Sequence, residues 1–236
     1  AGKARSDLLE LQDVEQPGIQ YPDDVLFRVE YCAICVGETK VYDWTSWAAE
    51  DRTLALPTVL GHEAAGVVVA VGPAVTQFKP GDRIVNDPLI YCGHCRQCRE
   101  GFTNMCEHRE IYGKRRGAFA EYAVLPERVI CPLPKKLSLQ EGTVLENLGI
   151  AVHAVESEHH DPGDWAVIIG AGPIGLTTAL WCRFFGARSV VVSETAASRA
   201  ALAQSMGATD VLRPDPAAGA AGLLAQYMDV AGGPPD

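Results

Sequence analysis

Four cysteines within one short segment have the spacing of a metal site. Cys92, Cys95, Cys98 and Cys106 form the pattern C-x2-C-x2-C-x7-C. Two-residue spacers let neighbouring thiolates converge on one ion, and four thiolates give zinc a closed tetrahedral shell with no position left for a substrate. The pattern therefore predicts a structural zinc site. Disulfides fit poorly with a protein expected to be cytoplasmic, and an iron–sulfur cluster is less usual at this spacing.

A second group of ligand-type residues comes from two separate segments. Cys35 lies in one segment, and His62 and Glu63 lie together in the other. One Cys, one His and one carboxylate would leave a zinc ion with an open position for a substrate. A lone Cys or His is more often part of the core, so each residue alone carries little weight. Cys32 forms a C-x2-C pair with Cys35, which is either a redox pair or, more simply, the chance spacing of a buried strand cysteine.

Glycines later in the chain have the spacing of a dinucleotide-binding turn. The sequence Gly-Ala-Gly-Pro-Ile-Gly at 170–175 follows a continuous apolar run and opens an apolar segment of helical character. In this context the glycines permit a tight turn and a close backbone approach to a pyrophosphate, and the helix N-terminus faces the phosphates. The residues assigned to cofactor contacts are Gly170, Gly172, Pro173, Ile174 and Gly175.

Two charged residues after this turn bear on which cofactor binds. Glu194 ends the next expected strand. A carboxylate at that point pairs with the adenosine ribose hydroxyls and repels a 2′-phosphate, which favours NAD over NADP. The alternative is that Glu194 is an exposed loop acid. Arg199 either lies near the adenosine or faces solvent.

The elements that must hold these residues change character along the chain. Residues 1–155 are β-rich, and short Val/Ile-rich runs alternate with Gly and Pro turns. We expect strands there at 25–29, 66–71, 83–85 and 120–125. Cys131 and Cys182, which belong to none of the ligand patterns, are expected in the core.

From residue 156 onward, apolar runs alternate with segments of helical periodicity. Strands are expected at 165–169, 189–193 and 210–212, and helices at 174–185 and 197–206. This alternation predicts a parallel sheet with crossover helices. The polar stretch 156–163 would connect the two regions.

Composition argues against some classes of partner. The formal net charge of −10 provides no basic stripe to follow phosphates, which argues against nucleic-acid binding. No segment reaches the roughly 18 consecutive apolar residues that a membrane-spanning helix needs, and the first residues lack the apolar core of a signal peptide. We therefore expect a cytoplasmic protein without membrane contact, in which the eight cysteines are thiols or metal ligands.

The order of these motifs resembles that of the zinc-containing medium-chain alcohol and polyol dehydrogenases. GHE-x2-G-x-V-x2-V-G at 61–72 and GDR at 81–83 precede the four-cysteine segment and the glycine-rich turn. The resemblance covers roughly residues 8–231 and implies an α/β protein. A β-rich GroES-like catalytic domain is expected at 1–155, followed at 156–236 by the first half of a Rossmann-type NAD-binding domain. The resemblance also implies further strands of the nucleotide-binding sheet beyond those visible in this sequence.

The resemblance also assigns the second metal site. It implies a catalytic zinc bound by Cys35 and His62, with Glu63 and Glu146 as acidic ligands or close neighbours. Many relatives have Glu-Pro where this chain has Glu146-Asn147, so Glu146 is alternatively a carboxylate at a helix start near the domain junction. Two zinc ions per chain and NAD are the expected cofactors.

The reaction implied by the resemblance is oxidation of an alcohol by NAD. Zinc lowers the pKa of the alcohol oxygen, and the nicotinamide accepts the hydride. Relatives usually have Ser or Thr two residues after the zinc Cys and often a His three residues further on, but this chain has Gly37 and Lys40. Water or Glu38 would then accept the proton. Lys40 would favour an anionic substrate group or, alternatively, simply face solvent.

Three further segments bear on the substrate. Residues 41–47, 117–122 and 148–153 look like the threonine 3-dehydrogenase and sorbitol dehydrogenase branch, although Gly37 and Leu89 replace a Thr and a His that the threonine enzymes have. A secondary alcohol, whether a polyol, an amino alcohol or a threonine-like molecule, is the expected substrate, and threonine itself is an alternative. A homodimer or homotetramer is expected. The rival from another class is a non-catalytic, zinc-stabilised binding or scaffold protein.

Overall fold

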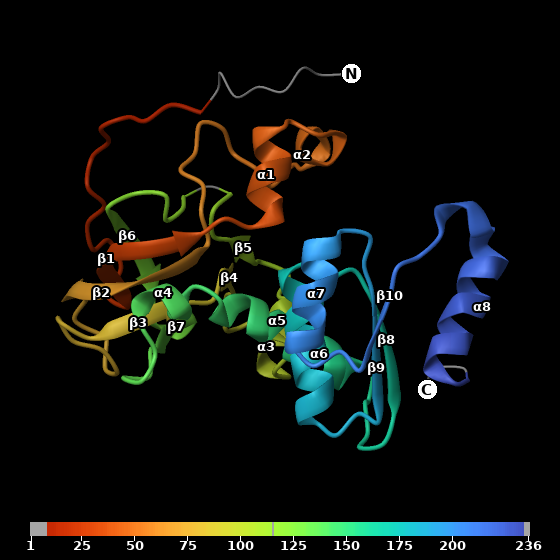
Figure 1. The fold of residues 1–236 in the computed structure, drawn as a ribbon. Helices are drawn as coiled ribbons and strands as arrows, with labels where there is room; N and C mark the ends of the chain where they lie inside the picture. The colour runs from red at the N-terminus through yellow and green to blue at the C-terminus, as the bar shows by residue number, and fades with distance from the viewer. Residues whose placement is uncertain (1–8, 115, 234–236) are drawn as a thin grey trace. The chain divides into compact units, whose positions relative to one another are not determined.

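The computed structural model describes residues 9–114 and 116–233. The chain forms two compact units, residues 1–146 and 147–236, and Figure 1 shows the elements of each. The first unit is built on an antiparallel sheet and the second on a parallel one. The predicted α/β fold class, with a GroES-like part and a Rossmann-type part, is confirmed.

The sheet of the first unit has the strand order β6-β1-β2-β3-β7. Its strands are β1 (Asp24–Ala33), β2 (Glu63–Val71), β3 (Arg83–Asn86), β6 (Tyr122–Pro126) and β7 (Ile130–Pro132). Neighbouring strands run antiparallel, and Ala33 at the end of β1 pairs with Glu63 at the start of β2. This register matters for function, because it brings the segment after β1 beside the segment before β2.

Alternate residues of these strands form the core of the first unit. The buried side chains include Val25, Phe27, Val68, Ile84, Tyr112 and Leu125. Each fully buried side chain of this size contributes roughly 1.5–3 kcal/mol to folding, so the strand ends that carry the ligand residues stand on a rigid base. Position 66 in β2 requires glycine, because a Cβ on Gly66 would collide with the carbonyl oxygen of Arg28 on β1.

Short elements surround this sheet. Two helices follow β1, α1 (Val36–Tyr42) and α2 (Ser46–Glu50), and α4 (Leu139–Gly142) packs on β1, β2 and β3. The strands β4 (Leu89–Ile90) and β5 (Glu110–Ile111) pair with each other and enclose α3 (Arg96–Arg99) and a 3-10 turn at Thr103–Met105. A second 3-10 turn, Glu127–Val129, joins β6 to β7.

The second unit contains a parallel sheet of order β10-β9-β8. Its strands are β8 (Trp165–Ile169), β9 (Ser189–Ser193) and β10 (Asp210–Leu212), with bounds equal to the predicted ones. The helices are α5 (Leu145–Ser157), α6 (Pro173–Phe184), α7 (Ala197–Ser205) and α8 (Gly219–Ala231), the last preceded by a 3-10 turn at Pro216–Ala218. In Figure 1, α6 and α7 cover one face of this sheet and α8 the other.

Two details differ from the sequence prediction. The division between the units follows Glu146, whereas the expected boundary followed residue 155. The reason is α5, which continues as one helix and packs Val155 into the core of the second unit. Cys182 is buried as expected, but Cys131 is exposed on the edge strand β7, so its assignment to the core was wrong.

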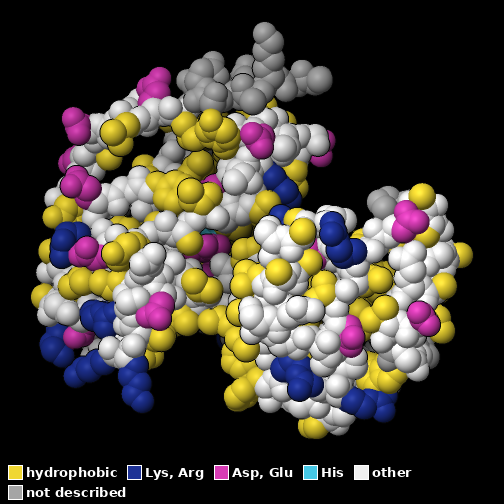
Figure 2. Space-filling view, in the orientation of Figure 1, with side chains coloured by type: hydrophobic (Ala, Val, Ile, Leu, Met, Phe, Trp, Pro, Cys, Tyr) yellow, Lys and Arg dark blue, Asp and Glu magenta, His cyan; other side chains and the backbone are white. Residues whose placement is uncertain are grey.

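The surface agrees with the compositional argument. On the face drawn in Figure 2, Lys and Arg side chains are interspersed with Asp and Glu, and the described residues there form no basic stripe. Among the described residues, no helix is long and apolar enough to cross a membrane.

Candidate active site and metal centres

The four cysteines of the predicted structural site converge in the segment between β4 and β5. Their Sγ atoms all lie within 4.8 Å of one another. The Sγ atoms of Cys92 and Cys98 are 3.9 Å apart, and those of Cys95 and Cys106 are 4.0 Å apart. A tetrahedral zinc ion with Zn–S distances of about 2.3 Å requires sulfurs about 3.8 Å apart. The donor set and its spacing therefore fit a closed zinc site.

Backbone N–H groups point at these sulfurs. Cys106 Sγ accepts from the backbone N–H of Cys92 at 3.3 Å and of His108 at 3.4 Å, and Cys92 Sγ accepts from Cys95 at 3.3 Å. Hydrogen bonds from the backbone N–H groups of Cys98 and Glu107 lower the pKa of Cys95 below its usual range. The loop thus stabilises the thiolates of Cys95 and Cys106, the form that binds zinc, whereas burial raises the pKa of Cys98 to about 12 in the absence of an ion.

The second predicted metal site is assembled by the β1–β2 register. Cys35 is the N-cap of α1, two residues after β1 ends, and His62 immediately precedes β2. Gly61 has a φ of +94°, and a Cβ there would collide with the ring of Phe119. That left-handed turn, which only glycine adopts readily, directs His62 toward Cys35. Ligand atoms of Cys35, Glu38 and His62 lie within 4.8 Å of one another.

Glu38 links the other two residues of this group. Its carboxylate accepts from the backbone N–H of Cys35 at 2.7 Å and lies 2.5 Å from Nδ1 of His62. Cys35 Sγ in turn accepts from the backbone N–H of Gly37 at 3.4 Å. This is a capping box in which Cys35 takes the place of the usual Ser or Thr. A carboxylate on one ring nitrogen of a histidine is also the usual partner of a metal-binding imidazole.

The electrostatics of the group favour a cation. Burial opposes a charge on His62, but hydrogen bonds and charges from Cys35 and Glu38 raise the pKa of His62 to about 10. Without metal, the ring therefore holds a proton at neutral pH. A zinc ion would replace that proton as the positive charge between Cys35 and Glu38.

The remaining predicted residues lie around this group. Glu63 is buried at the start of β2, and Glu146 lies in the first turn of α5. Burial and the negative charge of Glu63 raise the pKa of Glu146, and His62 opposes that rise. Among the described residues, neither Glu63 nor Glu146 joins the close set of ligand atoms, whereas Glu38 does. Sequence reasoning had given Glu38 only a proton-accepting role, although its capping-box spacing from Cys35 could have indicated this position.

Cys32 and Lys40 lie in surroundings that favour the simpler of their two expected roles. Burial raises the pKa of the Cys32 thiol to about 12, which makes a reactive thiolate unfavourable and supports a core thiol in β1. Lys40 is exposed, and its ammonium lies 5.2 Å from the ring centroid of Trp47.

A small cavity of about 110 Å³ opens beside the ligand group. Its wall is mostly apolar. The lining includes Glu38, Trp47, Asp51, Leu54, Leu60, His62 and Lys114. Lys114 is thus a cation in the cavity wall, and no sequence pattern pointed to it. Lys40 does not line this cavity.

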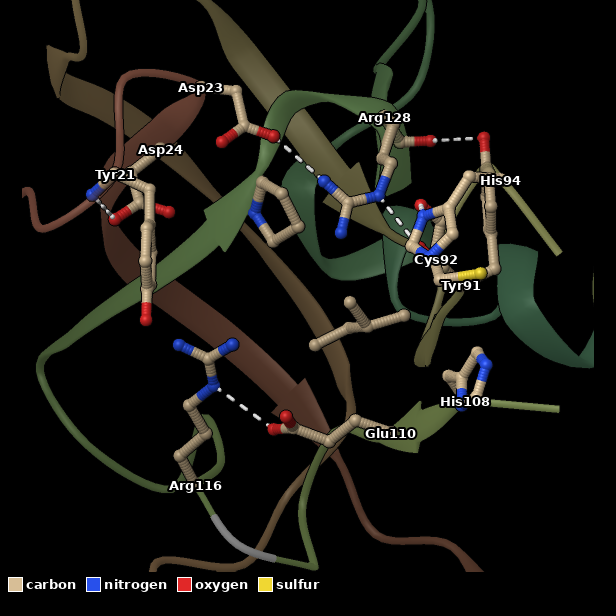
Figure 3. A pocket seen from close by; sticks show the side chains of 12 residues that line it. Tyr21, Asp23, Asp24, Tyr91, Cys92, His94, His108, Glu110, Arg116 and Arg128 are labelled. Atoms are coloured by element: carbon tan, nitrogen blue, oxygen red, sulfur yellow. Dashed lines mark hydrogen bonds and ion pairs between the residues drawn. The ribbon is translucent and has the colours of Figure 1, made fainter. Parts of the chain in front are cut away.

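A larger cavity of about 420 Å³ lies against the four-cysteine segment, and Figure 3 shows its lining. Its two arginines are already paired with carboxylates. Arg128 lies 2.7 Å from Asp23, and Arg116 lies 3.2 Å from Glu110. The groups able to do chemistry on a substrate surround the smaller cavity.

The second unit has the geometry of a dinucleotide site. Gly170 has a φ of +98°, Gly172 is the N-cap of α6, and Pro173 is its first residue. A Cβ at Gly175 would collide with the carbonyl oxygen of Gly170, so the turn can close only with glycine there. Ile174 follows in the first turn of α6. These residues leave the N-terminus of α6 open to a phosphate group.

Glu194 is buried, which rules out the exposed-acid alternative. Its side chain is 4% exposed and accepts from the backbone N–H of Ala171 at 2.9 Å and of Ala196 at 2.7 Å. The guanidinium of Arg199 on α7 donates hydrogen bonds to both carboxylate oxygens of Glu194, at 2.8 and 2.9 Å. The Arg199 guanidinium and these N–H groups hold the pKa of Glu194 well below its usual range. Arg199 therefore compensates the charge of Glu194, while its own side chain remains 54% exposed.

A GroES-like sheet carrying these cysteine and histidine groups, followed by a glycine turn on a parallel sheet, defines a class of two-part dehydrogenases. The alcohol dehydrogenase GroES-like domain matches residues 21–135. L-threonine 3-dehydrogenase of Shewanella sp. (strain ANA-3) is 38% identical over 200 residues, which cover 84% of this chain and 58% of the relative. The chain belongs to the zinc-containing medium-chain alcohol dehydrogenase family.

Solved structures agree with this assignment. A protein from Sinorhizobium meliloti 1021 described as a zinc-binding dehydrogenase and bound to NADP is 36% identical, with a TM-score of 0.79, over 89% of this chain and 59% of that one. Galactitol-1-phosphate dehydrogenase from Escherichia coli is 26% identical, with a TM-score of 0.85, over 97% of this chain and 64% of that one. The chain thus spans a little under two thirds of the length of these relatives.

Proposed function

We propose that the protein is a zinc-dependent oxidoreductase that transfers hydride between a secondary alcohol and NAD. The observation that carries this proposal is the convergence of Cys35, Glu38 and His62 on one wall of a small apolar cavity. A thiol and an imidazole are zinc ligands, and a carboxylate is the usual partner of a metal-binding imidazole, so the group suits zinc with a position left for a substrate. A relative of 38% identity is named a dehydrogenase of an alcohol-bearing amino acid, which supports the same reaction type.

Two zinc ions per chain are part of this proposal. Cys92, Cys95, Cys98 and Cys106 would hold the structural ion. Cys35 and His62 would hold the catalytic ion, with Glu38, Glu63 and Glu146 as the acidic residues around it. In that position zinc supplies a Lewis acid to the alcohol oxygen.

The residues of the chain prepare the site for this chemistry. Glu38 orients the His62 ring through Nδ1, and the capping box holds Cys35 at the start of α1. The apolar side chains of Leu54 and Leu60 in the wall make the cavity less polar than bulk water, which strengthens the electrostatic interactions inside it. Precise placement of this kind is what such a site contributes to catalysis.

Proton release follows an unusual route under this proposal. Gly37 offers no side chain, and both carboxylate oxygens of Glu38 are engaged, one by the backbone of Cys35 and one by His62. Glu38 is therefore a positioning residue, and water in the cavity accepts the proton. Lys40 is exposed, which supports its solvent-facing alternative.

The glycine turn of the second unit would bind the pyrophosphate of the nicotinamide cofactor, and Glu194 would favour NAD. Threonine is the particular substrate suggested by the relatives, since several of them are named L-threonine 3-dehydrogenase. A cytoplasmic homodimer or homotetramer completes the proposal. The scaffold alternative is disfavoured, because the four cysteines of one site and Cys35 and His62 of the other are retained and lie close together.

A substrate panel tests the proposal. Full-length protein, loaded with zinc, is mixed with NAD or NADP and a series of secondary alcohols, polyols and amino alcohols, and absorbance of the reduced nicotinamide is followed. We expect reduction with at least one alcohol, loss of activity in Cys35→Ser, and full activity in Cys131→Ser, which makes the same change at an exposed cysteine. Equal activity of Cys35→Ser and wild type, or no reduction with any alcohol, would contradict it.

A further inference from the structure

An ion pair is built into the wall of the small cavity. The ammonium of Lys114 lies 2.6 Å from the carboxylate of Asp51, and both residues line the cavity that Glu38 and His62 also line. The two side chains are only 21% and 11% exposed, although the residues are 63 positions apart in the sequence. A buried ion pair costs desolvation energy on both partners, so its presence in an otherwise apolar wall calls for a function.

The pair is held in one geometry. Asp51 Oδ1 accepts from the backbone N–H of Thr53 at 2.9 Å and from its hydroxyl at 2.6 Å. Burial opposes ionisation of Asp51, but the hydrogen bonds from Lys114 and Thr53 lower the pKa of Asp51 to about 2. Asp51 is therefore ionised at neutral pH, and it compensates the positive charge of Lys114.

One donor of Lys114 is left for a ligand. An ammonium group has three N–H donors. The contacts seen among the described residues use two of them, one to Asp51 and one to the hydroxyl of Thr53 at 3.0 Å. The ammonium also lies 5.5 Å from the ring centroid of Trp47, which lines the same cavity. The third donor can therefore bind an acceptor oxygen inside the cavity.

The size and charge of the cavity define the ligand. The volume of about 110 Å³ is smaller than the roughly 150 Å³ of a cavity that admits benzene, so the part of a substrate held there has few heavy atoms. Because Asp51 already compensates Lys114, an incoming carboxylate would meet the negative charge of Asp51. A neutral hydroxyl oxygen accepts the third N–H without that repulsion.

We propose that Lys114 and Asp51 are specificity-determining residues that select small neutral diols. In this arrangement Lys114 donates a hydrogen bond to the second hydroxyl of the substrate, while the first hydroxyl faces Cys35, Glu38 and His62. Asp51 sets the preference for a neutral group over an anionic one. The inference rests on the proposed function and narrows its substrate class to neutral diols, away from threonine, whose carboxylate would meet the negative charge of Asp51.

Three matched alcohols separate the effect of a neutral second hydroxyl from the effect of a carboxylate. 2-Butanol has one hydroxyl, 2,3-butanediol adds a neutral second hydroxyl, and 3-hydroxybutyrate carries a carboxylate instead. Kinetics with full-length, zinc-loaded protein are compared for wild type, Lys114→Met and Asp51→Asn. Lys79→Met is the control, since Lys79 belongs to an ion pair with Asp82 but is 82% exposed.

The variants have opposite expected effects. Lys114→Met raises the KM for 2,3-butanediol about tenfold or more, because a hydrogen bond from a charged donor is lost, and leaves 2-butanol nearly unchanged. Asp51→Asn leaves the Lys114 charge uncompensated, so 3-hydroxybutyrate improves relative to the diol, by about tenfold for a single new charged contact. Lys79→Met behaves as wild type. Equal losses of diol and 2-butanol in Lys114→Met, or no gain for the hydroxy acid in Asp51→Asn, would overturn the inference.

A binding measurement distinguishes failure of this inference from failure of the proposed function. If none of the three alcohols is oxidised, saturation-transfer NMR compares binding of 2,3-butanediol and 2-butanol to the same proteins. Stronger diol binding that is lost in Lys114→Met supports the pair as a diol-binding site, even though the proposed reaction has failed. Equal binding of both alcohols to wild type overturns it.

Discussion

Replacing Glu38 by glutamine removes the negative charge that lies 2.5 Å from Nδ1 of His62 while it keeps the shape of the side chain. Two effects on zinc affinity oppose each other. Loss of a carboxylate partner of a metal-binding histidine weakens affinity by about 10- to 100-fold, or about 1.4–2.7 kcal/mol. The same change lowers the pKa of His62, which Glu38 helps to hold at about 10, so less proton competition remains at pH 7. We therefore expect a small deficit in zinc affinity at pH 7 and a larger one at pH 9, with the full deficit reached only above about pH 10.

The chain offers a matched control for this change. Glu141 closes the capping box of α4 as Glu38 closes that of α1, accepting from the backbone N–H of Ser138 at 2.7 Å, but no histidine adjoins it. Zinc affinity is measured by competition with a chromogenic chelator at both pH values for wild type, Glu38→Gln and Glu141→Gln. Equal affinities of wild type and Glu38→Gln at pH 9, or equal losses in both variants, would refute the role assigned to Glu38.

Three further predictions address the proton on His62, the structural zinc and the cofactor. Metal-free His62 is protonated below about pH 10, so a proton competes with zinc for its ring. The zinc affinity of wild type therefore rises with pH between 6.5 and about 10, by up to about tenfold per pH unit from this proton alone. A flat affinity profile in chelator competition contradicts this. Cys98→Ser removes one zinc ion and lowers the melting temperature. The control Cys182→Ser, at a buried cysteine outside the metal sites, keeps both ions. Metal analysis counts the bound zinc, and calorimetry gives the melting temperature. Arg199→Ala leaves the negative charge of Glu194 uncompensated, so it raises the KM for NADP more than the KM for NAD. An unchanged ratio of the two KM values refutes the expected repulsion between Glu194 and the 2′-phosphate of NADP.

Elements with strong local patterns were predicted well. The strands β8, β9 and β10 match their expected bounds because each is a short, mostly apolar run rich in Val or Ile, although only β9 is largely buried. The end of β1 was missed, since it continues from the expected residue 29 to Ala33. Its last residues are exposed at Glu30 and Tyr31 and only partly buried after them, so a search for Val and Ile runs does not find them. Those residues are nonetheless the ones that carry the chain to Cys35.

The candidate site was predictable only in part. The cysteine pattern at 92–106 is local, so spacing alone indicated that these thiols meet. The approach of Cys35 to His62 depends on the pairing of Ala33 with Glu63, a long-range contact that no local spacing shows, and only the family resemblance suggested it. Lys114 meets Asp51 across 63 residues, and neither belongs to a motif, so the structure was needed to find the pair.

Stepwise removal of zinc from the full-length protein, with reduction of the nicotinamide followed at each step, tests the central claim most directly. Dipicolinate withdraws the accessible ion first, because Cys35, Glu38 and His62 adjoin a cavity while the other ion would have four thiolates around it. We predict that the rate falls in proportion to loss of the first zinc ion, with one ion still bound, and returns when zinc is added back. A rate that persists after the first ion has left would contradict the account.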